Sequence, residues 1–314
     1  MKLKVAVLFG GKSAEHEISL KSATNIFNAI DRSLFDPTLI GADKKGHWCY
    51  NKSYQEEQID LISNDYFGNA EYVYMRNTGQ ATEVVDQMGN QVLNTFDIAF
   101  PIIHGTFGED GTLQGFLKYL NIPFVGPDVL GSAVGMDKDV TKRLLRDANI
   151  SIAAFYTLSK HDPDQYTFAE IVDSLKLPLF VKPANAGSSV GVSKVTNQEE
   201  FDAALAEAFK FDNKILIEEA IVGKEVECAV LGNEAVRASV IGEIVPTQNF
   251  YSYDAKYVSA DGAKTKIPAD ISESVSDALR AEAIKAFKTI CCEGLSRVDF
   301  FLKEDNTFVL NEIN

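Results

Sequence analysis

The sequence predicts an α/β fold, because apolar strand-like runs alternate with helical patterns and glycines stand at the junctions. The run at 3–9 is typical of a strand covered on both faces, and a helical pattern extends from Ile18 to Ile30. A second apolar run, 98–103, leads into a glycine-rich turn, a helix-like GFLKYL segment and a short run at 123–126. We therefore expect a parallel sheet in this first part of the chain.

The rest of the chain predicts further helices separated by strand-like runs. A helix over 138–148 follows the glycine-rich GSAVG segment, and we place a domain boundary near it. A second helix begins at Asn197, with Glu200 three positions later as in a capping box, and a third helix covers 274–291. The segment 44–96 is polar and irregular and receives no element. Strand-like runs lie at 152–158, 178–184, 190–195, 214–220, 224–245, 297–302 and 308–313.

Composition limits the classes of function. The chain has 314 residues with a formal net charge of −15, and 46% of the residues are hydrophobic. Such an acidic chain is a poor partner for nucleic acid, whose phosphates must be neutralised by Lys and Arg. No stretch approaches the roughly 18 apolar residues of a membrane span, and the N-terminus lacks the long apolar region of a signal peptide. The four cysteines have no metal-ligand spacing, which is typical of reduced thiols, so we expect a cytoplasmic protein.

The strongest local signal is VKPANAGSSVGVSKV at 181–195. Lys182 ends an apolar strand, and the small-residue loop 186–189 separates it from a second strand. Glycine lets backbone N–H groups approach an anion, and serine hydroxyls add donors. The alternative is a plain hairpin with a flexible turn. A lysine in a buried strand needs a partner, so we favour a phosphate clamp.

Two groups of acids follow apolar strands. Glu218 and Glu219 end the run KILIEEA, with Glu225 close behind, and they suit either a solvated edge or the amino and hydroxyl groups of a nucleoside. The second group predicts a metal site. Glu312 and Asn314 lie two apart on one strand and so face one side of it, and Asp299 lies on the strand-like run before it. Oxygen ligands alone suit Mg²⁺ held between protein and nucleotide phosphates, whereas the alternative is a set of surface acids.

Two further segments have weaker signals. GGKS at 10–13 is not a Walker A motif, which requires glycine where this chain has Ala6. GGKSAEHEISL is therefore either an ordinary strand–turn–helix junction or a substrate-binding turn at the carboxyl edge of a sheet. The segment 246–266 is rich in Tyr, Ser, Asp, Gly and Lys, and loops of this length often serve as lids.

Eight segments follow one another in the register of a known family. In order, they are GGKSAEHEISL, HGTFGEDGTLQG, GSAVGMDK, VKPANAGSSVGVSKV, IEEAIVGKEVE, FYSYDAKY, RVDFF and NEIN. In these segments the chain resembles the D-alanine–D-alanine ligases of the ATP-grasp superfamily over nearly its whole length. The resemblance implies a Rossmann-like N-terminal domain, 1–136, and two ATP-grasp domains, 137–222 and 223–314, which enclose ATP between their sheets. The lid loop 246–266 would belong to the last domain.

The resemblance also implies a role for each matching site residue. Glu15 would hold the ammonium of the first D-alanine, His104 would lie beside the substrate, and Arg297 would stabilise the oxyanion. Glu15, Ser188 and Tyr257 would form a hydrogen-bonded set that docks the lid. The expected ATP ligands are Lys138, Lys182, Ser189, Glu218, Glu219, Ile221, Glu225, Lys256 and Phe301, and the expected ligands of two Mg²⁺ ions, which Mn²⁺ can replace, are Asp299, Glu312 and Asn314.

The implied reaction forms a D-alanyl phosphate from ATP, which the amine of a second D-alanine then attacks. The family continues past Asn314 with a glycine- and serine-containing segment, and we expect a disordered tail to follow here. A homodimer is also expected. A D-alanine–D-lactate ligase is the nearest alternative, disfavoured by the lid sequence SYDAKY. A non-catalytic nucleotide sensor on the same scaffold has no need of Arg297 or of three lysines.

Overall fold

The computed structural model describes residues 2–54, 58–162, 165–246 and 263–314. The chain divides into two compact units between Val129 and Leu130, and each unit is described by itself. The predicted boundaries of three domains, at 136/137 and 222/223, remain predictions. Among the described residues, no helix has both the length and the apolar character needed to cross a membrane.

The first unit is built on one seven-stranded sheet. Two helices accompany it, α1 (His16–Ala29) and α2 (Thr112–Tyr119). The strands are β1 (Leu3–Gly10), β2 (Phe35–Ala42), β3 (Trp48–Tyr50), β4 (Glu71–Asn77), β5 (Thr82–Asp86), β6 (Val92–Phe96) and β7 (Ile98–Pro101).

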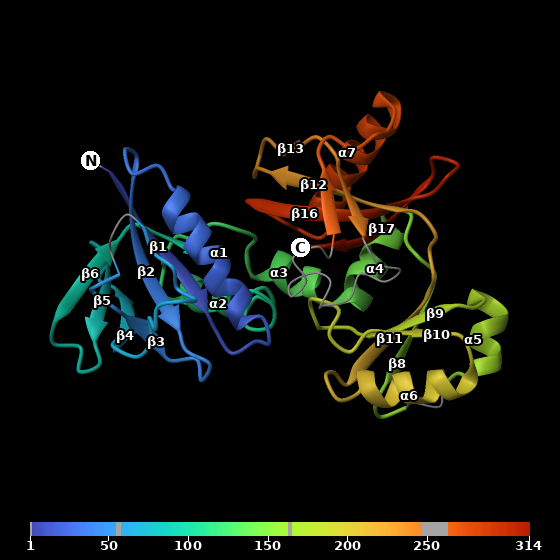
Figure 1. Ribbon diagram of the computed structural model, residues 1–314, viewed down its shortest axis with the longest axis horizontal. Helices are drawn as coiled ribbons and strands as arrows, with labels where there is room; N and C mark the ends of the chain where they lie inside the picture. Colours follow the sequence, from blue (N-terminus) through green and yellow to red (C-terminus); the bar gives the residue numbers. More distant parts are fainter. Residues whose placement is uncertain (1, 55–57, 163–164, 247–262) are drawn as a thin grey trace. The chain divides into compact units, whose positions relative to one another are not determined.

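The strand order of this sheet is β6-β5-β4-β3-β2-β1-β7 (Figure 1). Only β1, β2 and β7 are parallel to one another, whereas β2 to β6 form antiparallel pairs. The prediction of a parallel sheet is therefore right for three strands and wrong for the other four. The missed strands are β2 and those within 44–96, where short strands with exposed positions give little apolar periodicity.

Burial of β1 on both faces explains its nearly continuous apolar sequence. Val7 and Phe9 pack with Phe27 of α1, whereas Ala6 and Leu8 belong to the cluster that contains the buried side of α2. Successive side chains of a strand point to opposite faces, so both sets must be apolar.

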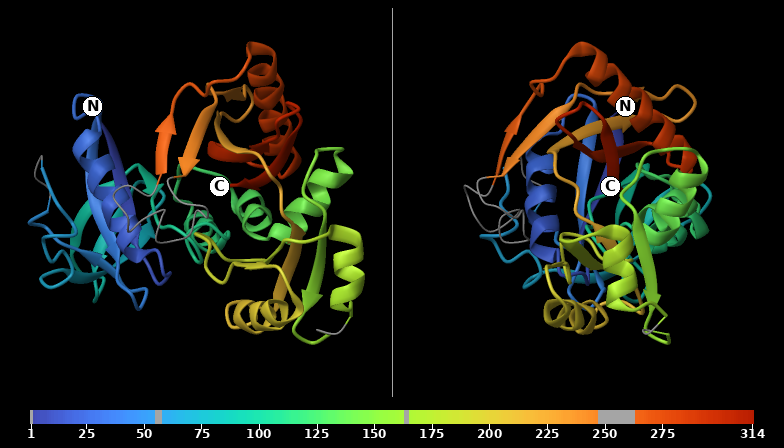
Figure 2. Two further views of the ribbon diagram at one scale, coloured as in Figure 1. Left: turned by 45° about the vertical axis from the view of Figure 1, so that its right-hand side comes forward. Right: turned by 90° about the vertical axis from the view of Figure 1, so that its right-hand side faces the viewer.

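The second unit contains two antiparallel sheets. The four-stranded sheet has the order β10-β9-β11-β8 and comprises β8 (Phe155–Ser159), β9 (Leu179–Pro183), β10 (Ser193–Val195) and β11 (Lys214–Glu219). Helices α5 (Phe168–Leu175) and α6 (Gln198–Ala208) share one apolar cluster with it and cover the same face, as Figures 1 and 2 show.

The six-stranded sheet packs against α7 (Glu273–Thr289), whose Leu279, Ala283 and Phe287 join the cluster of Val298 and Phe300. Its main path is β15-β14-β12-β16-β17, with β13 paired to β12. The strands are β12 (Lys224–Leu231), β13 (Arg237–Ala238), β14 (Gly242–Pro246), β15 (Ala263–Lys266), β16 (Leu295–Leu302) and β17 (Phe308–Ile313).

Two predictions in this part of the chain need correction. The run 224–245 is three strands, because the chain turns after β12 at Gly232, whose φ of +131° suits glycine. The predicted loop 246–266 has ordered ends, since Pro246 and Ala263 pair between β14 and β15. The interior of the predicted lid, 247–262, lies outside the described residues.

Helix α4 (Lys138–Asp147) contacts both sheets of the second unit. It follows α3 (Val129–Met136) and begins at Asp137, whose side chain accepts a hydrogen bond from Val140 N at 3.1 Å. Its Leu145 belongs to the apolar cluster of the six-stranded sheet. Its Asp139 accepts a hydrogen bond from Thr157 of β8 at 2.8 Å, so the helix is tied to the four-stranded sheet as well.

Candidate active site

The glycine pair after β1 positions the start of α1. A Cβ atom on Gly10 would lie 2.2 Å from the carbonyl oxygen of Ala42, and both Gly10 and Gly11 have positive φ angles. Ser19 of α1 accepts a hydrogen bond from Gly10 N at 2.8 Å, which holds the helix against the turn. GGKSAEHE is thus a strand–turn–helix junction that places Glu15 at the N-terminus of α1.

Glu15 and His104 lie close together in the first unit. Glu15 is 8% exposed, and a Cβ on Gly105 would lie 2.3 Å from its carboxylate, so glycine leaves room for that group. His104 Nε2 lies 3.0 Å from Ser22 Oγ, and its Nδ1 lies 3.4 Å from Glu109. Burial alone would lower the pKa of His104, but the carboxylates of Glu109 and Glu15 outweigh it and raise that pKa. The site suits a ligand with an ammonium group.

A buried carboxylate shared by two lysines lies in the four-stranded sheet. Lys182 Nζ lies 2.8 Å from Glu218 Oε2, and Lys142 Nζ of α4 lies 3.3 Å from Glu218 Oε1. We call Lys142, Glu218 and Lys182 the lysine cluster. Lys182 pairs in register with Leu216, so Lys182 and Glu218 are diagonal neighbours on one face.

Burial shapes the electrostatics of the lysine cluster. It lowers the pKa of Lys142, since the ammonium has little water around it. Burial would raise the pKa of Glu218, but Lys142 and Lys182 together hold that pKa below its ordinary value. Glu218 Oε1 makes an ion pair with Lys142 but accepts no hydrogen bond of good geometry from the described residues, so it can take a donor from a ligand.

Contacts from two other segments anchor the start of the small-residue loop after β9. Lys138 Nζ donates a hydrogen bond to Ala186 O at 2.7 Å, and Asn185 donates through its backbone and side chain to Asp212 at 2.8 and 2.9 Å. Ser188 and Ser189 have φ angles of 51° and 60°, a left-handed conformation uncommon for serine. Such backbone strain is concentrated at ligand-binding loops.

The acid cluster, as we call Glu227, Arg297, Asp299 and Glu312, lies on one face of the six-stranded sheet. Arg297 donates two hydrogen bonds to Asp299, at 2.8 and 2.7 Å, and its Nε lies 2.9 Å from Glu227. Glu227 and Glu312 are the register partners of Asp299 on β12 and β17. Asn314 Nδ2 donates to Asp299 at 2.9 Å.

Three carboxylates around one guanidinium leave the acid cluster with excess negative charge. Burial raises the pKa of Asp299 to about 6, Arg297 opposes the rise, and Glu312 and Glu227 add to it. The pKa of Arg297 is raised by the same carboxylates despite burial. No group of three or more His, Cys, Asp and Glu side chains in the described part of the chain is arranged to hold a metal. Asp299, Glu312 and the amide of Asn314 fit a hard cation that takes its remaining ligands from phosphate oxygens.

The remaining predicted ATP ligands have mixed outcomes. Glu219 accepts a hydrogen bond from Ala154 N at 2.8 Å. Glu225 is the register partner of Phe301, so Glu225 and Phe301 lie on the same face of their sheet. Lys256 and Tyr257 lie outside the described residues. Glu15 and Ser188 belong to different units, so the predicted lid-docking set stays a prediction.

The predictions omitted Lys142 and Glu227. A signal existed for each: Lys142 lies four residues after Lys138 on one helix, and Glu227 lies two residues after Glu225 on one strand. The spacing puts each omitted residue on the same face as a predicted one.

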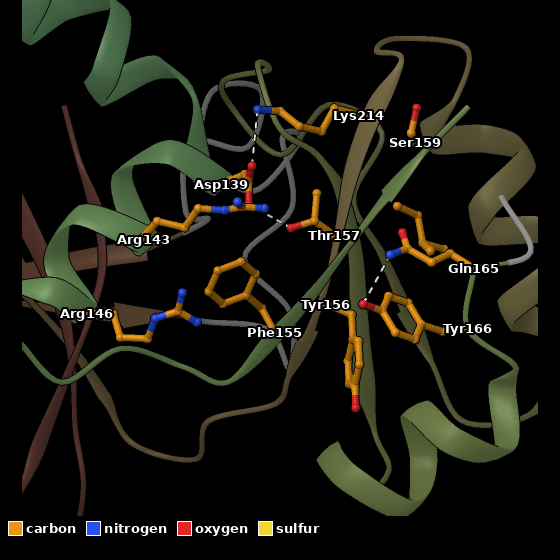
Figure 3. A pocket seen from close by; sticks show the side chains of 11 residues that line it. Asp139, Arg143, Arg146, Phe155, Tyr156, Thr157, Ser159, Gln165, Tyr166 and Lys214 are labelled. Atoms are coloured by element: carbon orange, nitrogen blue, oxygen red, sulfur yellow. Dashed lines mark hydrogen bonds and ion pairs between the residues drawn. The ribbon is translucent and has the colours of Figure 1, made fainter. Parts of the chain in front are cut away.

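A cavity of about 550 Å³ beside β8 contains none of the predicted residues (Figure 3). Its cationic groups are largely paired within the protein: Asp139 lies 2.8 Å from Arg143 and 3.4 Å from Lys214, which also reaches Asp137 at 2.6 Å. The two ion pairs of Lys214, on β11, connect the start of α4, the helix that contains Lys142, to the four-stranded sheet.

Known families match both halves of the chain. A model described as the D-ala D-ala ligase N-terminus matches residues 4–127, and one described as the D-ala D-ala ligase C-terminus matches 144–314. The chain belongs to the D-alanine–D-alanine ligase family. Its fold is that of the ATP-grasp ligases, as the solved structures of the family indicate.

Named members of the family resemble this chain over its whole length. It is 51% identical to the D-alanine--D-alanine ligase of Oceanobacillus iheyensis and 50% identical to D-alanine--D-alanine ligase A of Escherichia coli K12, covering 100% of this chain and 86% of each relative. The solved D-alanine-D-alanine ligase from Coxiella burnetii has a TM-score of 0.86 at 38% identity, over 100% of this chain and 84% of that one. The VanG D-Ala:D-Ser ligase of Enterococcus faecalis also gives 0.86, at 35% identity, over 100% and 90%.

Proposed function

We propose that this protein joins two molecules of D-alanine to D-alanyl-D-alanine, with conversion of ATP to ADP and phosphate, for peptidoglycan synthesis. The observation that carries the proposal is the match to D-alanine–D-alanine ligases, at 50 and 51% identity over 100% of the chain. The presence of Arg297, Asp299 and the lysine cluster accords with an enzyme that transfers a phosphoryl group. A D-lactate ligase and a non-catalytic sensor are not favoured.

The lysine cluster is the proposed adenine and phosphate site. Lys138 and Lys182 would contact phosphates. The ammonium of Lys138 donates to the small-residue loop, and Lys182 lies on β9, the strand that precedes this loop. The buried acceptor Glu218 Oε1 would receive a hydrogen bond from the adenine amino group. Other proposed nucleotide contacts are Ser189, Glu219, Ile221, Glu225, Lys256 and Phe301.

The acid cluster is the proposed magnesium site. Asp299, Glu312 and Asn314 supply oxygen ligands, and their excess negative charge is what two divalent cations would neutralise. When bound, Mg²⁺ offsets charge on the phosphates of ATP. Arg297, held at Asp299 and Glu227, would place its guanidinium where an oxyanion develops.

Glu15 and His104 would hold the first D-alanine. The buried carboxylate of Glu15 attracts an ammonium group, and the raised pKa of His104 favours its protonated form, which suits a carboxylate. Both residues lie at the carboxyl edge of parallel strands, the usual place for ligands in α/β sheets.

The proposed chemistry has two steps. A carboxylate oxygen of the first D-alanine attacks the γ-phosphorus of ATP, so a P–O bond forms and ADP leaves. The deprotonated amine of the second D-alanine then attacks the acyl carbon, and phosphate leaves from the tetrahedral intermediate that Arg297 stabilises. Water would hydrolyse the acyl phosphate, so we propose that 246–266 closes over it, with Tyr257 bonded to Ser188 and Glu15.

The test is to incubate the protein with ATP, Mg²⁺ and D-alanine, D-serine or D-lactate, one at a time and mixed with D-alanine. We expect D-alanyl-D-alanine and phosphate in equal amounts, with D-alanine alone sufficient. Phosphate release without dipeptide, or a mixed product made in preference, would contradict the assignment. We also propose a cytoplasmic homodimer, for which light scattering should give twice the chain mass of 34.5 kDa.

A further inference from the structure

Lys142 lies where a lysine is rarely found. It is 2% exposed and occurs in the middle of α4, with its Nζ 3.3 Å from Glu218, 3.5 Å from Ala153 O and 5.5 Å from the ring centre of Phe155. An ammonium group loses most of its hydration in such a place, which is costly unless another charge compensates it. Its compensating charge is the Glu218 carboxylate.

The two lysines on Glu218 differ in what they can reach. The side chain of Lys182 is 12% exposed and lies on β9 just before the anchored loop, whereas that of Lys142 is 2% exposed. Only Lys182 can extend to a ligand without rearrangement of the core. Lys142 can act only on groups inside the protein.

Binding of a phosphate to Lys182 would weaken the charge compensation of the Glu218 carboxylate. Lys182 Nζ lies 2.8 Å from Glu218 Oε2, so a phosphate that pairs with Lys182 competes with this carboxylate for its positive charge. A buried carboxylate left without a partner is strongly unfavourable. Lys142 is buried beside Glu218 and out of reach of a phosphate, so it can compensate the carboxylate whether or not Lys182 is engaged.

We propose that Lys142 is a positioning residue of the nucleotide site: it keeps Glu218 charge-compensated, so that Lys182 is released to bind a phosphate of the nucleotide. Lys142 does not touch the ligand. The inference rests on the proposed function only in taking a nucleotide as the ligand. Because its test measures binding, its failure is distinct from a failure to make dipeptide.

If Lys142 acts through its charge, removal of the Glu218 charge should suppress the effect of removing the Lys142 charge. Lys142→Met keeps the length and removes the charge, so ATP affinity should fall about tenfold or more, equivalent to about 1.4 kcal/mol. Glu218→Gln removes the carboxylate that Lys142 serves, yet keeps an acceptor oxygen for adenine. The Lys142→Met/Glu218→Gln double variant should bind ATP within about twofold of Glu218→Gln alone, because a neutral pair can replace a buried ion pair at little cost.

Calorimetry with ATP and Mg²⁺ on the full chain measures these affinities. Arg146→Met is the matched control, since it removes one positive charge from the exposed side of the same helix, and it should leave ATP affinity unchanged. Steady-state kinetics should show the Lys142→Met effect in KM for ATP more than in kcat, with KM for D-alanine unaltered. A loss in kcat alone would overturn the proposal.

If Lys142→Met does not fold, the comparison of the double variant with Glu218→Gln can still refute the charge mechanism. If Lys142 only fills space, its replacement should weaken ATP binding equally with and without the Glu218 charge. A double variant that binds ATP tenfold more weakly than Glu218→Gln would therefore refute the charge mechanism. Equal affinities of these two variants, with ATP binding weakened in Lys142→Met and unchanged in Arg146→Met, would support it, whereas unchanged binding in Lys142→Met would refute it.

Discussion

The lysine cluster and the acid cluster lie in the same unit and have opposite charge balance. In the first, two ammonium groups share one buried carboxylate, whereas in the second three carboxylates surround one guanidinium. Each cluster is therefore complementary to one part of a magnesium nucleotide: excess positive charge suits phosphate, and excess negative charge suits divalent cations. Helix α4 joins the two, because Lys138 lies 4.0 Å from Glu312 and Lys142 lies one turn further along.

The comparison predicts its largest effect at Arg297. Arg297→Met should lower kcat roughly 10²–10³-fold, as loss of one oxyanion donor does in other enzymes. ATP affinity should change much less, because the lysine cluster is intact. Arg237→Met, an exposed arginine on β13 of the same sheet, serves as control. Equal losses in the two variants would remove Arg297 from the chemistry.

The next effect concerns the metal. Asp299→Asn should lower the apparent Mg²⁺ affinity by more than about tenfold, since even groups behind a metal ligand contribute 10–100-fold. Turnover measured across a Mg²⁺ titration tests this. Asp305→Asn, at the exposed turn between β16 and β17, should behave like the wild type. An unchanged Mg²⁺ curve for Asp299→Asn would place the cations elsewhere.

On the other cluster, Lys182→Ala should weaken ATP binding about tenfold, because it removes a charge-assisted contact with phosphate. D-Alanine binding should not change, since Glu15 and His104 belong to the other unit. Lys194→Ala, an exposed lysine of β10, is the control. Calorimetry that found equal ATP affinity in both variants would argue against a phosphate contact for Lys182.

The smallest effect lies in the first unit. Glu109→Gln should bring the pKa of His104 down toward its ordinary value of 6.5, measured by NMR titration. Because folding raises this pKa, the contribution of the protonated His104 to stability is full below about 6.5 and is lost as pH rises through the folded value. A His104 titration unaffected by Glu109→Gln would mean that Glu15 or another group sets the raised pKa.

The sequence predicted the elements whose burial is periodic. Strand β1 and helices α1 and α7 lie close to their expected positions, because each has a continuous apolar run or one apolar face. Helix α4 also lies where it was expected, although Leu145 is its only apolar residue among the four that are buried. The antiparallel part of the first sheet escaped prediction, since hydrophobic periodicity does not give strand direction. The acids of β16 and β17 were correctly placed side by side, but the β-bulge between Asp299 and Phe300 that accompanies their pairing has no sequence signal.

The burial of Lys142 beside Glu218 could not be predicted from the sequence. A lysine within a helix is normally exposed, and only the packing of α4 against β11 makes this one a buried partner of Glu218. Glu227 is similar, because its contact with Arg297 depends on the pairing of β12 with β16. Roles carried by a family motif could be assigned from sequence, whereas roles created by packing required the structure.

The complementarity of the two clusters is tested most directly by calorimetric ATP affinities with and without Mg²⁺, in the wild type, Lys182→Ala and Asp299→Asn. We expect Mg²⁺ to strengthen ATP binding in the wild type and in Lys182→Ala, which should be weaker than the wild type under both conditions. In Asp299→Asn most of the strengthening by Mg²⁺ should disappear. Equal dependence on Mg²⁺ in all three proteins would contradict the assignment of phosphates to one cluster and cations to the other.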